Sequence, residues 1–325
     1  RVDHLLRGVA GFLTGGRVAG RYVVAVASGE AAMGLISVIA LFEKYYQSGF
    51  AIGFWQKLGT PVFLLMTLTG FVIYRYRETR VMTLAQFFEV RYSKRFRIFA
   101  GLLAFFSGVL NYAIFPAVGA RFFIYYTGLP EAVEVAGWSV SLYPVVMAAF
   151  LGLALLIVMA GGQLVVMVTD CVQGIFSYAG YALVAIAIFW FFSFDHFAEA
   201  MAARPSGRSF INPFDTADLT DFNLLFVFIG IAAGVYNRMS WQGAQGYNAA
   251  AINAHEQKMA GVLGTWRGGF QTLMIMLLAI AAYTFMHHPD FTAQAAAVQA
   301  ELAHRVGGAT DAAAQTLSKQ MVVPV

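Results

Sequence analysis

The sequence has few charged residues and almost no cysteine for its length. Of 325 residues, 12% are charged and 59% hydrophobic, whereas about 25% charged residues is usual for a soluble globular chain. So apolar a chain is neither disordered nor a coiled coil. The single cysteine, Cys171, cannot form an internal disulfide. The net charge of +4 is small, and nucleic-acid binding would need basic residues clustered on one face. We therefore expect the lipid bilayer as a partner, and no nucleic acid.

The motifs of common soluble enzymes are also missing. The sequence has no HExxH zinc-protease motif, no GxSxG nucleophile elbow and no GxxxxGK[ST] phosphate-binding loop. His287, His288 and Asp290 offer metal-binding groups, but adjacent histidine side chains diverge and no further ligand is near in sequence, which favours a solvated loop. We expect neither an enzyme nor an organic cofactor.

Long apolar stretches are what the sequence has in abundance. A helix of about 20 apolar residues crosses the hydrocarbon core of a bilayer, where every backbone polar group must be paired internally. Seven stretches reach this length: residues 22–42, 50–74, 98–126, 140–160, 164–192, 222–247 and 262–286. The sequence therefore predicts an all-α, polytopic membrane protein with about seven spans.

The segments between the spans indicate the orientation of the chain. Residues 1–21 contain four of the 21 Lys and Arg residues, and residues 75–97 contain seven. Because basic residues accumulate on the cytoplasmic side, the N-terminal segment is expected in the cytoplasm and the protein in the plasma (inner) membrane. Glycines in residues 1–21 argue against a helix there, whereas Thr83 is placed to cap a short helix. The apolar residues 320–325 resemble the start of another span, so we expect a fragment.

Three ionisable residues lie inside predicted spans. Glu30 is near the middle of the first span, Arg238 near the middle of the sixth, and Asp170 in the first turns of the fifth. A charge at mid-bilayer costs at least about 2.5–3.5 kcal/mol unless it is paired or hydrated. Since Glu30 and Arg238 are at similar depth, we predict that they form a buried pair. Asp170 either anchors the positive end of its helix or takes part in ion traffic.

Small and polar residues interrupt two of the predicted spans. The first span contains Ala27-Ser28-Gly29-Glu30-Ala31-Ala32, and the sixth contains four glycines together with Asn237 and Ser240. Two interrupted helices in corresponding positions of two repeats indicate a midplane binding site in secondary transporters. Small residues also let helices pack closely without any such site. Composition alone leaves both interpretations open.

Several local strings resemble the sodium:solute symporter family. The strings, in chain order, are residues 11–21 with their glycines and arginines, TLAQFFEVRYS at residues 83–93, Gly161-Gly162 followed by Thr169-Asp170 and Gln173, and Trp241 and Gln245 followed by the polar residues 255–258. Their order and spacing agree with the family over nearly the whole chain.

The resemblance implies a five-plus-five inverted-repeat symporter fold in one transporter domain. The first repeat would cover about residues 22–192 and the start of the second about 222–286, with a pre-helix segment at 1–21 and an outer loop and the start of the next span at 287–325. Family members carry a small organic solute together with sodium by alternating access. Another possibility is a membrane sensor of the same fold, fused to a signalling module such as a histidine kinase.

The resemblance also assigns residues to the site. Sodium ligands would be the carbonyls of Val24 and Ala27, with Ser28 beside them, and Asp170 would assist ion release. Substrate contacts would come from positions on the first and sixth spans: Glu30, Ala31, Asn237, Trp241 and Gln245. Sugar carriers have an amide where this chain has Ala31, which favours an amino acid, a carboxylate or a similar solute over a sugar.

Overall fold

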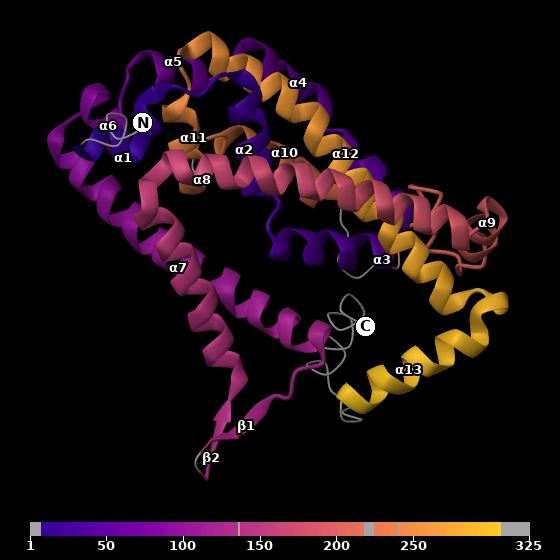
Figure 1. Ribbon diagram of the computed structural model, residues 1–325. Coiled ribbons are helices and arrows are strands. Elements are labelled where there is room, and N and C mark those ends of the chain that lie inside the picture. Colours follow the sequence, from indigo (N-terminus) through magenta and orange to yellow (C-terminus); the bar gives the residue numbers. More distant parts are fainter. Residues whose placement is uncertain (1–7, 136, 218–223, 240, 307–325) are drawn as a thin grey trace.

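In the part of the chain that the structure describes, the fold is almost entirely helical, with one short hairpin (Figure 1). The computed structural model describes residues 8–135, 137–217, 224–239 and 241–306. The N-terminal elements are α1 (Gly8–Thr14), η1 (Gly15–Arg17), α2 (Arg21–Ala32), α3 (Leu35–Lys57), α4 (Thr60–Thr69), α5 (Ile73–Glu78), α6 (Leu84–Arg91) and α7 (Lys94–Thr127). They are followed by β1 (Ala132–Val135), β2 (Trp138–Ser141), α8 (Leu142–Phe191), α9 (Phe194–Ala202), α10 (Leu224–Tyr236), η2 (Gln242–Ala244), α11 (Gln245–Ala250), α12 (Ala254–His287), η3 (Pro289–Phe291) and α13 (Thr292–Val306). The predicted next span beyond residue 306 lies outside the described residues.

Helices long and apolar enough to cross a membrane form the body of the molecule. Among the described residues, α7, α8 and α12 each meet this test, and α2 with α3, bent by 65° at a short break, makes a fourth candidate. Two long helices contain kinks, at Gly49 in α3 and at Gly161 and Gly162 in α8. These kinks fall where the sequence predicts boundaries between spans. The protein is therefore membrane-embedded and multi-pass, while the count of seven spans stays a prediction.

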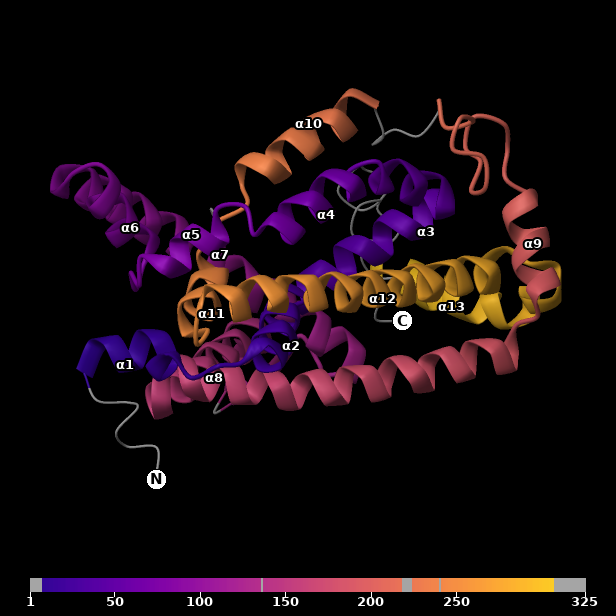
Figure 2. The same cartoon turned by 90° about the horizontal axis from the view of Figure 1, so that it is seen from above.

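Helix α12 occupies the centre of the fold. Its apolar window is 44% buried, against 11% for α8 and none for α7. Figure 2 shows α12 between α8 on one side and α3 with α4 on the other, and α10 beyond α4. Ile275 and Ala279 of α12 pack with Phe42 and Tyr45 of α3 in one apolar cluster. Helix α12 therefore packs against α2, α3 and α8 and connects them.

The short helices at the expected inner end begin and end for local reasons. The Thr83 hydroxyl accepts a hydrogen bond from the backbone N–H of Gln86, which confirms the predicted cap of α6. The expectation that glycines prevent a helix before residue 21 is wrong, because residues 8–14 form α1. This helix packs at the kink of α8, where a Cβ on Gly162 would lie 2.4 Å from the Phe12 carbonyl oxygen. Only a glycine permits that approach.

The interruption of the first predicted span lies later than expected. The sequence predicts a break within residues 27–32, but α2 continues to Ala32 and the chain turns at Met33 and Gly34. Gly34 has an extended backbone and precedes the first turn of α3. Gly29 remains helical, and a Cβ at this position would lie 3.0 Å from the Arg267 side chain. The small residues before the break thus serve close packing against α12.

Candidate functional site

A buried ion pair joins α2 to α12. The Arg267 guanidinium donates to Glu30 Oε1, and the two side chains are 10% and 8% exposed. Gln271 Nε2 donates to the same oxygen at 3.1 Å, and Ser177 Oγ donates to Glu30 Oε2 at 2.9 Å. The carboxylate therefore receives donors from α8 and from two positions of α12, which compensates for its removal from water.

Arg267 is held by an aromatic ring as well as by the carboxylate. Its guanidinium carbon lies 4.5 Å from the centroid of the Tyr178 ring, in cation–π geometry. Tyr178 in turn stacks on Phe270, with 5.4 Å between the ring centroids. Among the described residues, Arg267 Nε is buried without a hydrogen-bond partner. The guanidinium is thus fixed between an anion and a ring, with one donor unused.

The predicted pair of Glu30 with Arg238 is wrong. Arg238 follows the end of α10 and donates instead to Thr67 Oγ1 on α4, at 3.0 Å. Depth along a span does not fix which face of a helix a side chain occupies, and α12 lies between the two positions. Arg267 is the partner that sequence reasoning missed. Its position inside the predicted span 262–286 is the signal that could have found it.

The sixth predicted span is interrupted, as expected. Helix α10 ends at Tyr236, and the chain resumes regular structure in η2 and α11. Gln245 Oε1 accepts from the backbone N–H of Leu84 at 3.0 Å, which ties it to the start of α6. Trp241 is 38% exposed and Asn237 is also exposed. Ala31 packs against an apolar cluster that joins α2 to α8, α11 and α12, so the shared site of these residues with Ala31 stays a prediction.

The predicted sodium ligands lie in the regular part of α2. Val24 and Ala27 are fully buried, and the Ser28 hydroxyl donates to the Val24 carbonyl oxygen at 2.6 Å. Their carbonyls therefore belong to the helix and not to the break at Met33. Their role as sodium ligands stays a prediction.

Asp170 connects α8 to α11. Tyr247, which is buried, donates its hydroxyl to Asp170 Oδ2 at 2.5 Å. Residues around it form an apolar cluster that includes Val24, Met167 and Ala250. Asp170 thus lies next to the helix that carries the predicted sodium ligands, in a position where its charge could assist a cation.

Backbone pairing closes the expected inner end. Ala19 donates its N–H to the Ala250 carbonyl at 3.1 Å, and Ile252 donates to the Ala19 carbonyl at 3.0 Å. Arg77, 5% exposed, donates to the carbonyls of Ala251 and Ile252 at 2.5–3.0 Å. Burial, followed by the positive charge of Arg17, lowers the pKa of Arg77. The end of α11 is therefore locked to the segment before α2 and to α5.

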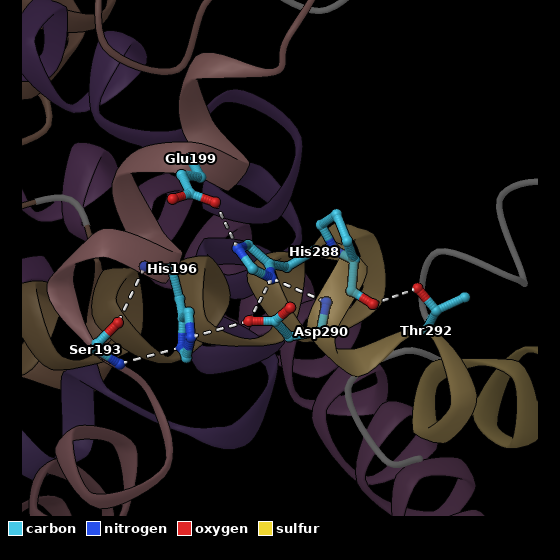
Figure 3. A network of polar contacts seen from close by, with 7 residues as sticks. Ser193, His196, Glu199, His288, Asp290 and Thr292 are labelled. Atoms are coloured by element: carbon cyan, nitrogen blue, oxygen red, sulfur yellow. Dashed lines mark hydrogen bonds and ion pairs between the residues drawn. The ribbon is translucent and has the colours of Figure 1, made fainter.

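At the opposite end, a cluster of histidines and acids connects α9 to η3 (Figure 3). His288 Nε2 lies 3.1 Å from Glu199 Oε2, and His196 Nε2 lies 3.5 Å from Asp290 Oδ2. His288 is 4% exposed, so the expectation of a solvated loop is wrong for this residue. Its Nδ1 accepts from the Asp290 backbone N–H at 3.2 Å, which leaves Nε2 to donate. Within the described ranges, no group of three or more His, Cys, Asp or Glu side chains is arranged to hold a metal ion.

A cavity of about 180 Å³ lies between α3, α4 and α10. Its walls are largely apolar, and Lys44 and Gln56 are the polar side chains that line it: Lys44, Ile52, Gln56, Phe63, Phe226, Val227, Gly230 and Ile231. Sequence reasoning did not single out either polar residue. The isolated lysine between the first two predicted spans is the signal that could have done so.

Comparison with known proteins places this arrangement in a family. The profile of the sodium:solute symporter family matches residues 12–325. The chain belongs to this family. Its members are transporters and not enzymes. No curated protein matches the chain. A solved structure of a Na⁺-coupled sialic acid symporter, in a substrate-bound outward-open state, is similar with a TM-score of 0.69 and 15% identity. The similarity covers 99% of this chain and 66% of that one, so the chain spans slightly less than two thirds of its length.

Proposed function

We propose that the protein carries a small organic solute across the plasma membrane together with sodium, by alternating access. The observation that carries this proposal is the family match over residues 12–325. The two interrupted helices support it, because regular helix is lost between α2 and α3 and again between α10 and α11. Broken helices offer unpaired backbone ends to an ion or solute within the membrane. A five-plus-five repeat with a cytoplasmic N-terminal segment is part of the same proposal.

Sodium is the proposed coupling ion, with Val24, Ala27 and Ser28 as ligands. In the described conformation the Ser28 hydroxyl donates to the Val24 carbonyl. Sodium binding would replace this hydrogen bond by contacts of the Ser28 hydroxyl oxygen and the Val24 carbonyl oxygen with the cation. The hydrogen bonding of α2 would be weaker at that point. Asp170, held by Tyr247 from α11, would attract the ion toward the inner end. Sodium and solute affinities would then be reciprocally linked.

The proposed solute is an amino acid, a carboxylate or a molecule of similar size. Residues predicted to contact it are Ala31, Asn237, Trp241 and Gln245. Glu30 was predicted among them, but its carboxylate is occupied by Arg267, Gln271 and Ser177. In this conformation Glu30 orients α2 and α12 and offers no free oxygen. No comparison supports the sensor interpretation.

Uptake into proteoliposomes tests this function. Full-length protein is reconstituted and a panel of labelled amino acids and carboxylates is offered with an inward sodium gradient, with an equal potassium gradient, and with sodium equalised by an ionophore. We expect accumulation only in the first condition. Ser28→Ala should weaken sodium activation, whereas Ser37→Ala, whose hydroxyl donates to the Ala32 carbonyl at 3.3 Å, should not. Accumulation that is indifferent to sodium for every solute carried would reject the coupling.

A further inference from the structure

The cavity between α3, α4 and α10 combines one cation with apolar walls. Lys44 is half-buried and lies on α3 where this helix faces α10. Among the described residues no carboxylate lies within 4 Å of its ammonium group, since none of the salt bridges includes Lys44. A lysine in an apolar wall is costly unless it meets water or an anion. The cavity therefore favours a negatively charged group.

The second polar side chain of the cavity presents a donor. The Tyr45 hydroxyl donates to Gln56 Oε1 at 2.9 Å. With its oxygen occupied, Gln56 has its two amide N–H groups available. Lys44 and Gln56 are thus both donors, which matches the acceptor-only oxygens of a carboxylate. Helix α10 supplies Phe226 and Val227 to the same wall.

The rest of the wall decides what is attached to the carboxylate. Ile52, Phe63 and Ile231 are apolar, so a hydrocarbon or aryl group is favoured and hydroxyl groups are not. The volume of about 180 Å³ is below the roughly 300–1,000 Å³ of drug-sized sites. The ammonium group of an amino acid would be repelled by Lys44, and a sugar would leave Lys44 unpaired.

We propose that Lys44 and Gln56 form a binding site for a small monocarboxylate with an apolar tail, in the cavity between α3, α4 and α10. A role of this site in transport rests on the proposed function, whereas the binding itself rests on the cavity alone. Lys44 sets the specificity for a negative charge, and Gln56, positioned by Tyr45, provides the second hydrogen bond.

Binding of benzoate and of its neutral amide, benzamide, tests the site. Dissociation constants are measured by saturation-transfer NMR on full-length protein in lipid nanodiscs, with and without sodium. We expect benzoate to bind more tightly than benzamide. Lys44→Gln should weaken benzoate by about 10-fold to 100-fold, the range for a hydrogen bond to a charged group, and should leave benzamide unchanged. Lys44→Arg should retain most of the affinity. Lys57→Gln, an exposed lysine outside the cavity, is the matched control.

A second measurement covers the case in which Lys44→Gln does not fold. In a Cys171→Ser background, Gln56→Cys should react with a thiol reagent and be protected by benzoate but not by benzamide. Equal protection of Gln56→Cys by both compounds would overturn the proposal. An equal loss of benzoate affinity in Lys44→Gln and Lys57→Gln would also overturn it. Bound phospholipid that is lost in Lys44→Gln while benzoate never binds would identify a lipid and also overturn it. Lys44-dependent binding without any effect of sodium would uphold the site and count against sodium coupling.

Discussion

The ion pair between Glu30 and Arg267 gives the sharpest test of the structure. Both side chains are at least nine-tenths buried, so removing one partner leaves an uncompensated charge. Such a loss typically costs about 3–5 kcal/mol. We expect Glu30→Gln to approach the upper value, because the Arg267 guanidinium then loses its counter-charge and retains only a neutral amide oxygen and the Tyr178 ring. Arg267→Met should cost less, since Gln271 and Ser177 still donate to the carboxylate.

The double variant distinguishes pairing from independent effects. Glu30→Gln with Arg267→Met removes both charges and preserves most of the volume, so it should recover much of the lost stability. The expected coupling free energy is about 2–3 kcal/mol. The measurement is equilibrium unfolding of the purified single and double variants in mild detergent, followed by tryptophan fluorescence.

The control for this cycle uses the arginine that the sequence had favoured. Arg238 contacts Thr67 on α4 and makes no recorded contact with Glu30. Glu30→Gln combined with Arg238→Gln should therefore be additive within about 0.5 kcal/mol. The packing of α12 against α2 would be refuted if the effect of Glu30→Gln on the free energy of unfolding added to that of Arg267→Met but was coupled to that of Arg238→Gln.

Three further substitutions test the close contacts at the two ends. Gly49→Ala should destabilise the protein by about 1–3 kcal/mol, because Gly49 has φ of 53° and a Cβ would lie 2.6 Å from the Phe210 ring. The additional change Phe210→Ala should relieve only the steric part of this loss. A Gly49→Ala variant as stable as the unchanged protein would contradict the contact. Gly162→Ala should be worse tolerated than Gly49→Ala in the same thermal unfolding assay, since its Cβ would meet a backbone oxygen of Phe12 that cannot rotate away. Arg77→Met should expose the end of α11 to proteolysis, because it removes three hydrogen bonds to carbonyls; unchanged proteolysis would show that the lock is dispensable.

The sequence predicts the helical membrane class and the existence of both interruptions, but not their details. Apolar length and the two glycine-rich segments depend on local composition, so they can be read directly from the sequence. The position of the first break cannot be read from local composition. Residues 27–32 have weak helix propensity, yet α2 persists through them because Gly29 and Ala27 pack closely in the bundle. The turn falls at Met33 and Gly34 instead, where a Cβ on Gly34 would meet no atom within 4 Å.

For the site residues too, the sequence predicts which residues carry a buried charge but not which partners they contact. Asp170 was singled out for its charge, and the structure gives it a hydrogen-bond partner that no local pattern indicated, Tyr247. Glu30 was singled out correctly as a buried charge, but its partner depends on which helix lies beside α2. That information is in the tertiary packing of α12 and not in the depth of a residue along its span.

The charges inside the bundle differ in how they are compensated, and this difference separates structure from recognition. Arg267 faces a carboxylate, and Arg238 a hydroxyl. Each of these groups has a protein partner that offsets part of its cost in the bilayer. Lys44 has no such anion among the described residues and lines an open volume. A half-buried cation that lines an open volume without a protein anion is stabilised by water or by a bound anion, so recognition of an anion is tested first at Lys44.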